Sequence, residues 1–304
     1  MKKFILKIFI LLSVVFLLDR IIGYTMMHVI NNIEIGGMGR DNYICNKATE
    51  DILIFGSSRA VHHYNAAMIE DSLNHTCYNC GDDGNGIILN YGRLLMCKER
   101  KLPNLILYDV ATSFDFGQND NTKYLGWLRA RYDRPGISDI FKAVEPLEAY
   151  KMCSYMYRYN TRFLQNLVVY TTHISTDTGI KGFRPIHAEM DTLKIKARSY
   201  KPIQPDSLKI SYIHKFLDET TESKVIFLVS PEWYGSFPGE YDVIKNICKE
   251  RNLDFIDFSN NPKYVHNNTY FKDGTHLNAR GADEFTKDLI DSLQTRYTME
   301  ELFQ

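Results

Sequence analysis

The chain has 304 residues, which is enough for one large domain or two small ones. Its apolar content of 44% and charged content of 24% are ordinary for a globular protein. The formal net charge is −1, which excludes any argument for nucleic-acid binding from overall charge.

Residues 1–23 differ in composition from the rest of the chain. Lys2 and Lys3 precede the apolar run Ile8–Leu18, a pattern typical of a secretory signal or an N-terminal anchor. The run alone is short for a span of about 20 residues, but flanking apolar residues lengthen it if Lys7 reaches back to the headgroups. Since no convincing cleavage site follows, we predict an uncleaved, single-pass signal anchor. A cleaved signal peptide and an amphipathic helix of a soluble protein remain alternatives.

The positive-inside rule gives this anchor a direction. Lysines at the N-terminus stay in the cytoplasm, so the body is expected outside the cytoplasmic membrane, in the periplasm or at the cell surface. Residues 24–48 follow as a polar connector with a glycine-rich stretch at Gly36–Gly39.

The body, residues 49–297, alternates between expected strands and helices, and a short tail, residues 298–304, follows it. Short apolar runs predict strands at 52–55, 76–79, 105–108, 225–229 and 255–258. Helical spacing predicts helices at 66–73 with Asn65 as cap, 87–98, 241–251, and after the cap Asn278. This alternation predicts a three-layer α/β fold, with a central parallel sheet flanked by helices.

Residues from about 120 to 205 interrupt the alternation with an aromatic and basic stretch. Between Lys123 and Lys201 there are 14 Lys or Arg against 7 Asp or Glu, a net charge of +7. We interpret the stretch as a helical insertion in the α/β body. It is either a solvated surface or a cap that binds an anionic or sugar-like polymer, since aromatic and basic side chains suit both ligands.

The six cysteines indicate neither a zinc site nor a redox centre. Cys77 and Cys80 form the only close pair, and one pair does not supply four zinc ligands. We interpret the cysteines mainly as buried apolar residues. Disulfides are compatible with an exported domain, but the spacing does not assign them. The sequence predicts no metal site and no cofactor.

Two distant blocks hold the residue types of a serine nucleophile, its base and the residue that orients the base. Ser58 follows the first expected strand, at the sheet edge where α/β proteins place their sites. Asp273 and His276 lie three positions apart near the C-terminus, so that a carboxylate can fix the imidazole tautomer. Each also has a structural alternative: a capping serine, a turn aspartate and a surface histidine.

These blocks resemble those of the SGNH (GDSL-like) hydrolase superfamily, over residues of about 50 to 295. Gly56-Ser57-Ser58 stands where Gly-Asp-Ser is usual, and Asp273-Gly274-Thr275-His276 matches the closing D-x-x-H block. The resemblance implies an SGNH/flavodoxin-like fold, Ser58 as nucleophile and Gly84, in the block from Asn79 to Gly86, as the oxyanion-hole glycine.

The third block of the superfamily, G-x-N-D, is not in register. Ser113 stands at the position of its oxyanion-binding Asn, while a literal Gly-Gln-Asn-Asp places Asn119 six residues later. Arg59 is a further candidate for oxyanion or substrate binding. A structural role for it, paired with Asp82, Asp83 or Asp109, stays open.

The Gly-Ser-Ser-Arg form together with an N-terminal anchor is similar to a membrane-anchored subset of the superfamily. That subset includes the D-alanyl transfer protein of teichoic acids and proteins of polysaccharide O-acetylation. The resemblance implies an ester hydrolase or O-acyltransferase acting on a cell-envelope glycan. Implied partners are that polysaccharide, the membrane and a membrane-bound acyltransferase, with no nucleic acid. The alternative is a catalytically inactive scaffold of an envelope polysaccharide complex, because the third-block Asn is missing.

Overall fold

The computed structural model describes residues 1–177, 179–191, 198–199 and 202–303. The chain divides into two compact units. The helical unit contains residues 1–46 and 121–177, and the sheet unit contains residues 47–120 and 178–304.

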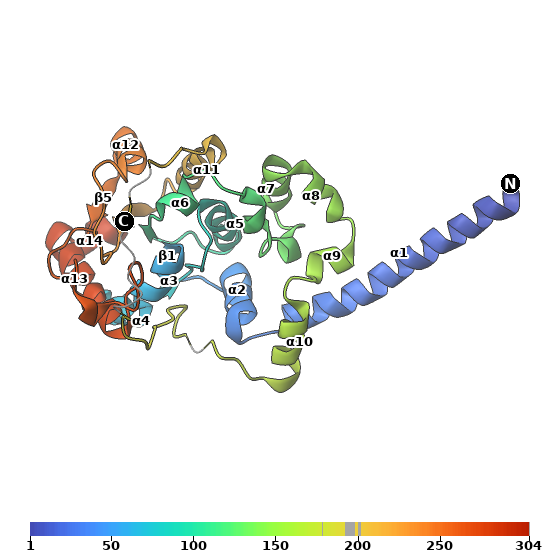
Figure 1. Ribbon diagram of the computed structural model, residues 1–304, viewed down its shortest axis with the longest axis horizontal. Coiled ribbons are helices and arrows are strands. Elements are labelled where there is room, and N and C mark those ends of the chain that lie inside the picture. Colours follow the sequence, from blue (N-terminus) through green and yellow to red (C-terminus); the bar gives the residue numbers. More distant parts are fainter. Residues whose placement is uncertain (178, 192–197, 200–201, 304) are drawn as a thin grey trace. The chain divides into compact units, whose positions relative to one another are not determined.

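The sheet unit is built on five parallel strands (Figure 1), with the order β2-β1-β3-β4-β5. These strands are β1 (Ile52–Gly56), β2 (Cys77–Asn79), β3 (Leu105–Asp109), β4 (Lys224–Val229) and β5 (Asp254–Asp257). Each of the five predicted strands is confirmed, within one residue of its expected bounds. The parallel pairing brings the carboxyl ends of β1, β3 and β4 to one edge of the sheet.

Helices cover both faces of this sheet, which confirms the three-layer α/β class. They are α3 (Ser58–His63), α4 (Ala66–Leu73), α5 (Ile87–Lys98), α6 (Thr112–Asp115), α11 (Ser207–Asp218), α12 (Asp242–Arg251), α13 (Ala279–Arg296) and α14 (Met299–Phe303), with a 3₁₀ turn, η4, at Asn268–Tyr270.

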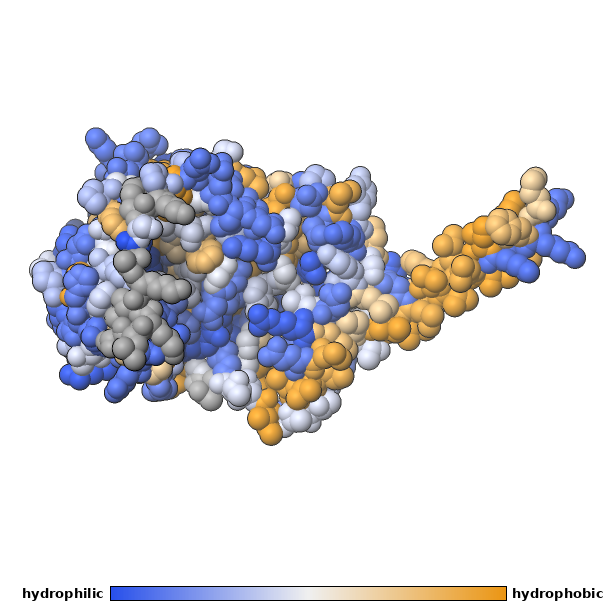
Figure 2. All heavy atoms as spheres, in the orientation of Figure 1, coloured by the Kyte–Doolittle hydropathy of each residue, from blue (hydrophilic) through white to orange (hydrophobic). Residues whose placement is uncertain are grey.

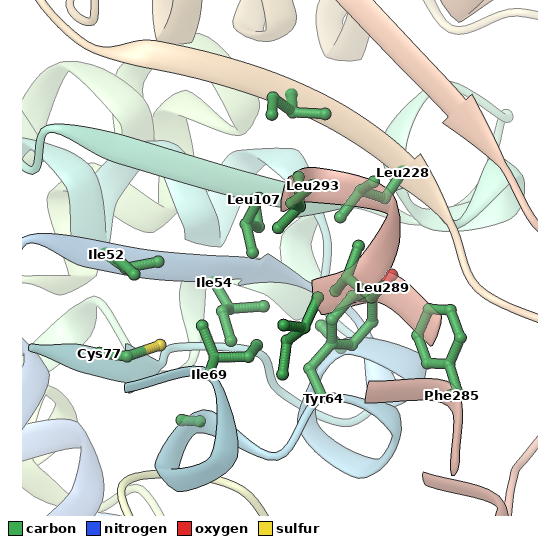
Figure 3. Close-up of a cluster of buried hydrophobic side chains, with 14 of the residues drawn as sticks. Ile52, Ile54, Tyr64, Ile69, Cys77, Leu107, Leu228, Phe285, Leu289 and Leu293 are labelled. Atoms are coloured by element: carbon green, nitrogen blue, oxygen red, sulfur yellow. The ribbon is translucent and has the colours of Figure 1, made fainter. Parts of the chain in front are cut away.

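The two faces of the sheet bury alternate residues of the same strands. Ile54 of β1 and Leu107 of β3 face the core that α13 closes with Leu289 (Figure 3). Phe55 and Tyr108, one position further along, instead meet the Phe216 ring of α11 edge-on, at 5.5 Å between ring centroids. Period-two burial on both faces explains why the strands read as continuous apolar runs.

Two predicted caps begin their helices as expected. The Asn65 side chain accepts a hydrogen bond from the Met68 amide at the start of α4, and Asn278 accepts one from the Gly281 amide at the start of α13. Asn278 also donates through Nδ2 to the carbonyl oxygens of Thr269 and Phe271, so the same side chain fixes the segment before the helix.

The helical unit differs from the predicted connector and insertion. Its helices are α1 (Lys2–Asn31), α2 (Gly36–Asn46), α7 (Ile137–Val144), α8 (Pro146–Lys151), α9 (Tyr155–Tyr159) and α10 (Phe163–Thr172), with 3₁₀ turns at Asn121–Leu125 and Arg129–Arg131. Residues 24–48, expected as a connector, therefore lie mostly in α1 and α2. Residues 121–177 form one unit with the N-terminal segment, because α9 and α10 pack along α1.

A polar pair holds α1 to this unit at its middle. The Asp19 carboxylate accepts hydrogen bonds from the Ser154 hydroxyl (2.5 Å) and the Tyr155 amide (3.0 Å), and so caps α9. Arg20 donates to the Cys153 carbonyl oxygen and lies over the Tyr155 ring at 4.1 Å. Beyond this pair α1 buries Met26, Val29 and Ile30 in the core of the unit, whereas its first half stays exposed.

By length, hydropathy and charge taken together, no helix among the described residues qualifies to cross a membrane. The predicted transmembrane segment at residues 1–23 therefore finds no support in the structure. Within the expected span, the charged side chains of Asp19 and Arg20 bind the start of α9 and the residue before its cap. The apolar surface of α1 is visible in Figure 2 as the hydrophobic length of the projecting helix.

We expect Leu289→Ala to lower the free energy of unfolding by about 2–5 kcal/mol, because the buried side chain packs between α13 and the sheet and its loss leaves a cavity. Urea unfolding followed by circular dichroism measures the change. The exposed Ile180→Ala in the same unit serves as control and should change the free energy by less than about 0.5 kcal/mol. Equal effects of the two substitutions would contradict this packing.

Candidate active site

Ser58 is presented by a sharp turn at the carboxyl end of β1. Gly56 has φ +142°, and a Cβ at this position would lie 2.6 Å from the Asp109 carbonyl oxygen, so only glycine fits. The chain then passes through Ser57, which precedes α3, and Ser58 is the first residue of that helix. The first block of the sequence thus places the Ser58 hydroxyl at the sheet edge where the strands β1 and β3 end.

The loop before α13 brings the imidazole to this hydroxyl. His276 Nε2 lies 2.8 Å from Ser58 Oγ, although 218 positions separate the two residues in the chain. His276 Nδ1 lies 3.0 Å and 3.1 Å from the two carboxylate oxygens of Asp273. Since a carboxylate only accepts, Nδ1 carries the proton, and Nε2 is left to accept the hydrogen bond of the serine hydroxyl.

The loop that contains Asp273 holds its carboxylate in position to orient the His276 ring. Its Oδ1 accepts hydrogen bonds from the Thr275 and His276 amides, both at 2.9 Å, which closes a tight turn. Burial opposes ionisation of the carboxyl group, but the hydrogen bond and charge of His276 and the two amides outweigh it and leave the pKa of Asp273 well below its usual value. The carboxylate therefore stays ionised and fixes the ring.

Ser58 opens into a small cavity of about 190 Å³ at the end of the sheet. Its lining consists of Ser58, Arg59, Ala111, Thr112, Ser113, Phe114, Arg198, Glu232, Glu240, Tyr241 and Thr275. Among the candidates for the third-block donor, this cavity includes Ser113 and not Asn119. The position that is in register with the superfamily block is thus the one beside Ser58.

Asn119 belongs instead to the support of the loop behind the cavity. Its Nδ2 donates to the Ser113 carbonyl oxygen at 2.5 Å, and its Oδ1 accepts from the ammonium group of Lys209 at 2.9 Å. The same buried ammonium group donates to the carbonyl oxygens of Ser113 (3.1 Å) and Gly117 (2.7 Å). Lys209, which the sequence analysis did not single out, therefore positions Ser113 together with Asn119.

Gly84 lies in an exposed loop after β2. It has φ +68°, and a Cβ there would meet no heavy atom within 4 Å. The space beside its Cα is therefore open, but Gly84 is not among the residues of the cavity beside Ser58.

Arg59 is buried and forms ion pairs whose partners the sequence did not identify. Its guanidinium pairs with Asp109 at 3.1 Å and with Glu232, and it donates to the Val110 carbonyl oxygen. Of the three carboxylates considered, Asp109 is the one that pairs with it. Asp82 pairs with Arg93 and Asp83 with Arg184.

Four further residues of the cavity wall were not predicted from the sequence. Arg198 binds Glu232 (Nη1 to Oε2, 2.9 Å) and also pairs with Glu240, while the Tyr241 hydroxyl donates to Glu232 at 2.8 Å. These residues come from irregular segments, where no periodicity marks a charged group as functional. The result is a wall of alternating charge beside Ser58.

His63 supports the His276 loop from inside the core. The Leu277 amide donates to His63 Nε2 at 2.9 Å, so the proton lies on Nδ1, which donates to Ser230 Oγ at 2.9 Å. Burial keeps the pKa of His63 well below its ordinary value, with the neighbouring His276 and Arg59 acting in the same direction. A neutral ring thus fixes the backbone next to His276.

No protein-family model and no curated protein matches this chain. Solved structures that resemble it include a candidate platelet activating factor from Streptococcus pneumonia (14% identity, 93% of this chain and 96% of that chain, TM-score 0.39). Another is a candidate acylhydrolase from Bacteroides fragilis (12% identity, 86% of this chain and 97% of that chain, TM-score 0.37). A third is a candidate lipolytic protein of the G-D-S-L family from Desulfitobacterium hafniense (12% identity, 80% of this chain and 99% of that chain, TM-score 0.37). At these TM-scores the likeness carries no weight for chemistry, which rests on the site geometry.

We expect His63→Leu to lower the free energy of unfolding by about 1–3 kcal/mol or more, because the Leu277 amide and the Ser230 hydroxyl lose a buried partner. His63→Gln keeps one acceptor and one donor and should cost less. Urea unfolding of both variants measures the difference. A leucine variant as stable as the glutamine variant would show that these hydrogen bonds do not hold the loop.

Proposed function

We propose that the chain is a serine ester hydrolase or O-acyltransferase that acts through Ser58, His276 and Asp273. The observation that supports it is the continuous hydrogen-bonded series from Ser58 Oγ to His276 Nε2 and from His276 Nδ1 to Asp273. The Ser58–His276 distance of 2.8 Å lies within the reach that proton transfer to a general base requires.

In the proposed reaction the Ser58 oxygen attacks the carbonyl carbon of an O-acyl ester while its proton passes to His276 Nε2. The tetrahedral adduct then collapses, the ester C–O bond breaks, and the leaving alcohol takes the proton from His276. A second hydroxyl, from water or from a sugar, repeats these steps on the acyl-serine. Water as acceptor makes the protein an esterase, and a sugar hydroxyl makes it a transferase. Asp273 stays ionised throughout and stabilises the imidazolium.

The developing oxyanion needs donors, which we assign to the backbone amides of Ser58 and Gly84 and to the Ser113 hydroxyl. Ser113 lines the cavity with Ser58, whereas the Asn119 amide is engaged with the Ser113 carbonyl and Lys209. A hydroxyl donor in place of an amide donor is the feature in which this site departs from the superfamily pattern.

We propose a glycan of the cell envelope as the acyl carrier, with the body on the extracytoplasmic side of the cytoplasmic membrane. The charged and hydroxyl groups of the cavity wall can bind sugar hydroxyls, and they disfavour a long acyl chain, since burying methylenes against paired charges costs their hydration. The first half of α1 would attach the protein to the membrane through its exposed apolar side chains. A membrane-bound acyltransferase would be the donor if the protein transfers acyl groups.

A fluorophosphonate probe and the hydrolysis of p-nitrophenyl acetate test the nucleophile. We expect Ser58→Ala to abolish labelling and to lower kcat by about three to six orders of magnitude, with a similar loss for His276→Ala. Ser57→Ala is the matched control, because Ser57 is the adjacent serine and its buried hydroxyl has no hydrogen-bond partner among the described residues.

Each outcome separates two functions. Labelling that needs both Ser58 and His276 supports the enzyme. Absence of labelling in the unaltered protein, with normal folding, contradicts it and favours the scaffold of an envelope polysaccharide complex that the out-of-register third block suggested.

The membrane attachment is tested with Phe9→Asp combined with Leu12→Asp in the full chain. A charged residue placed in the apolar interior of a bilayer costs up to about 3 kcal/mol, so the variant should lose most of its co-flotation with lipid vesicles. Ile180→Asp, which changes an exposed apolar residue of the sheet unit, should float as the unaltered protein does. Equal flotation of all three proteins would contradict the attachment through α1.

A further inference from the structure

Exposed large apolar side chains are concentrated in the helical unit. Outside the first 35 residues, this unit exposes a set on and after α8, α9 and α10, which consists of Leu147, Tyr150, Met156, Leu164, Val168 and Ile174. We call this set the apolar collar. In the described part of the sheet unit, by contrast, only Ile180 and Met299 belong to this class. Exposed apolar residues gathered on one set of helices mark an interaction surface.

Two of the three collar helices hold α1. Both α9 and α10 pack along α1, and α8 is joined to α9 by the hydrogen bond from the Tyr157 hydroxyl to Glu148 at 2.8 Å. Figure 1 shows α9 and α10 beside α1, and α8 on the far side of α9. The collar residues on α9 and α10 therefore lie on helices that adjoin α1 within the helical unit.

The charge of the two units has opposite sign. The helical unit contains 13 Lys or Arg against 8 Asp or Glu, a net +5, while the sheet unit contains 23 against 29, a net −6. Lys142 and Lys151, on either side of the collar residue Leu147 in the sequence, keep at least half of their side chains exposed, and each pairs with a carboxylate, that of Asp139 or Glu148. Basic residues near a membrane surface contribute about 1 kcal/mol each towards binding anionic lipid.

We propose that the apolar collar binds the headgroup region of an anionic lipid bilayer, beside the point where α1 enters it. Leucine, valine and tyrosine side chains would enter the interface, and the exposed lysines would exchange their present carboxylate partners for lipid phosphates. The proposal rests on the proposed membrane attachment through α1 and adds a second, in-plane contact. A bilayer is favoured over a protein partner because the collar adjoins an apolar helix and lies on the unit of positive charge.

The test places a fluorescent label at one position at a time in the full chain. Cys153, the exposed native cysteine, is first replaced by Ser, since the other five are buried. A single cysteine then replaces Phe9 in α1, Leu164 in the collar or Ile180 in the sheet unit, and carries nitrobenzoxadiazole. Leu164 is 78% exposed and Ile180 63% exposed, so neither label disturbs the core and the two positions form a matched pair.

We expect vesicles of phosphatidylcholine with phosphatidylglycerol to lower iodide quenching several-fold at positions 9 and 164 and to leave position 180 unchanged. Pure phosphatidylcholine should protect position 164 less. Protection at 9 without protection at 164 would overturn the collar contact and leave the attachment through α1 intact. No protection at either position contradicts both, and protection at 164 alone supports the collar contact against the attachment through α1. Protection at 164 before vesicles are added would identify a protein contact, such as a second copy, and would also overturn the proposal.

Discussion

The buried Arg59 guanidinium is the constraint on which the site depends. It stands in α3, directly after Ser58, and pairs with Asp109 at the end of β3 and with Glu232 beyond the end of β4. Removing one member would leave an uncompensated charge in the core, which costs several kcal/mol. Burial opposes the charged form, but the neighbouring Tyr241, Asp109 and Glu232 raise the pKa of Arg59, so the charge is permanent. One cation thus fixes Ser58 relative to two other strands.

The same cluster extends to the loop of the base. The Ser230 hydroxyl favours the charged form of Asp109 and accepts a hydrogen bond from His63, and His63 in turn accepts one from the Leu277 amide, next to His276. A polar path inside the core therefore connects the ion pair beneath the nucleophile with the backbone beside the base. Buried hydrogen bonds and ion pairs of this kind limit movement, which suits a pair of groups that must stay within hydrogen-bonding distance without a covalent link.

The sequence predicted what short apolar runs and turn chemistry dictate. The five strands follow from buried runs ended by polar or glycine residues, and the meeting of Ser58 with His276 follows from the edge that parallel strands share. The continuation of α1 to Asn31 was missed, although Met26, Val29 and Ile30 have helical spacing, because the polar residues around them suggested a connector. The Arg198–Glu240 pair left no signal at all, since ion pairs between irregular segments follow no period.

The net charge of the whole chain says little about which surfaces the protein binds. A net charge of −1 is the sum of a basic unit that carries the apolar helix and an acidic unit that carries the serine, histidine and aspartate. Electrostatic attraction to a surface acts over about a Debye length, roughly 8–10 Å in physiological salt, so each unit responds mainly to its own charges. The opposite charges of the two units therefore cancel in the net charge of the chain, although each unit still attracts ions and surfaces of the opposite sign.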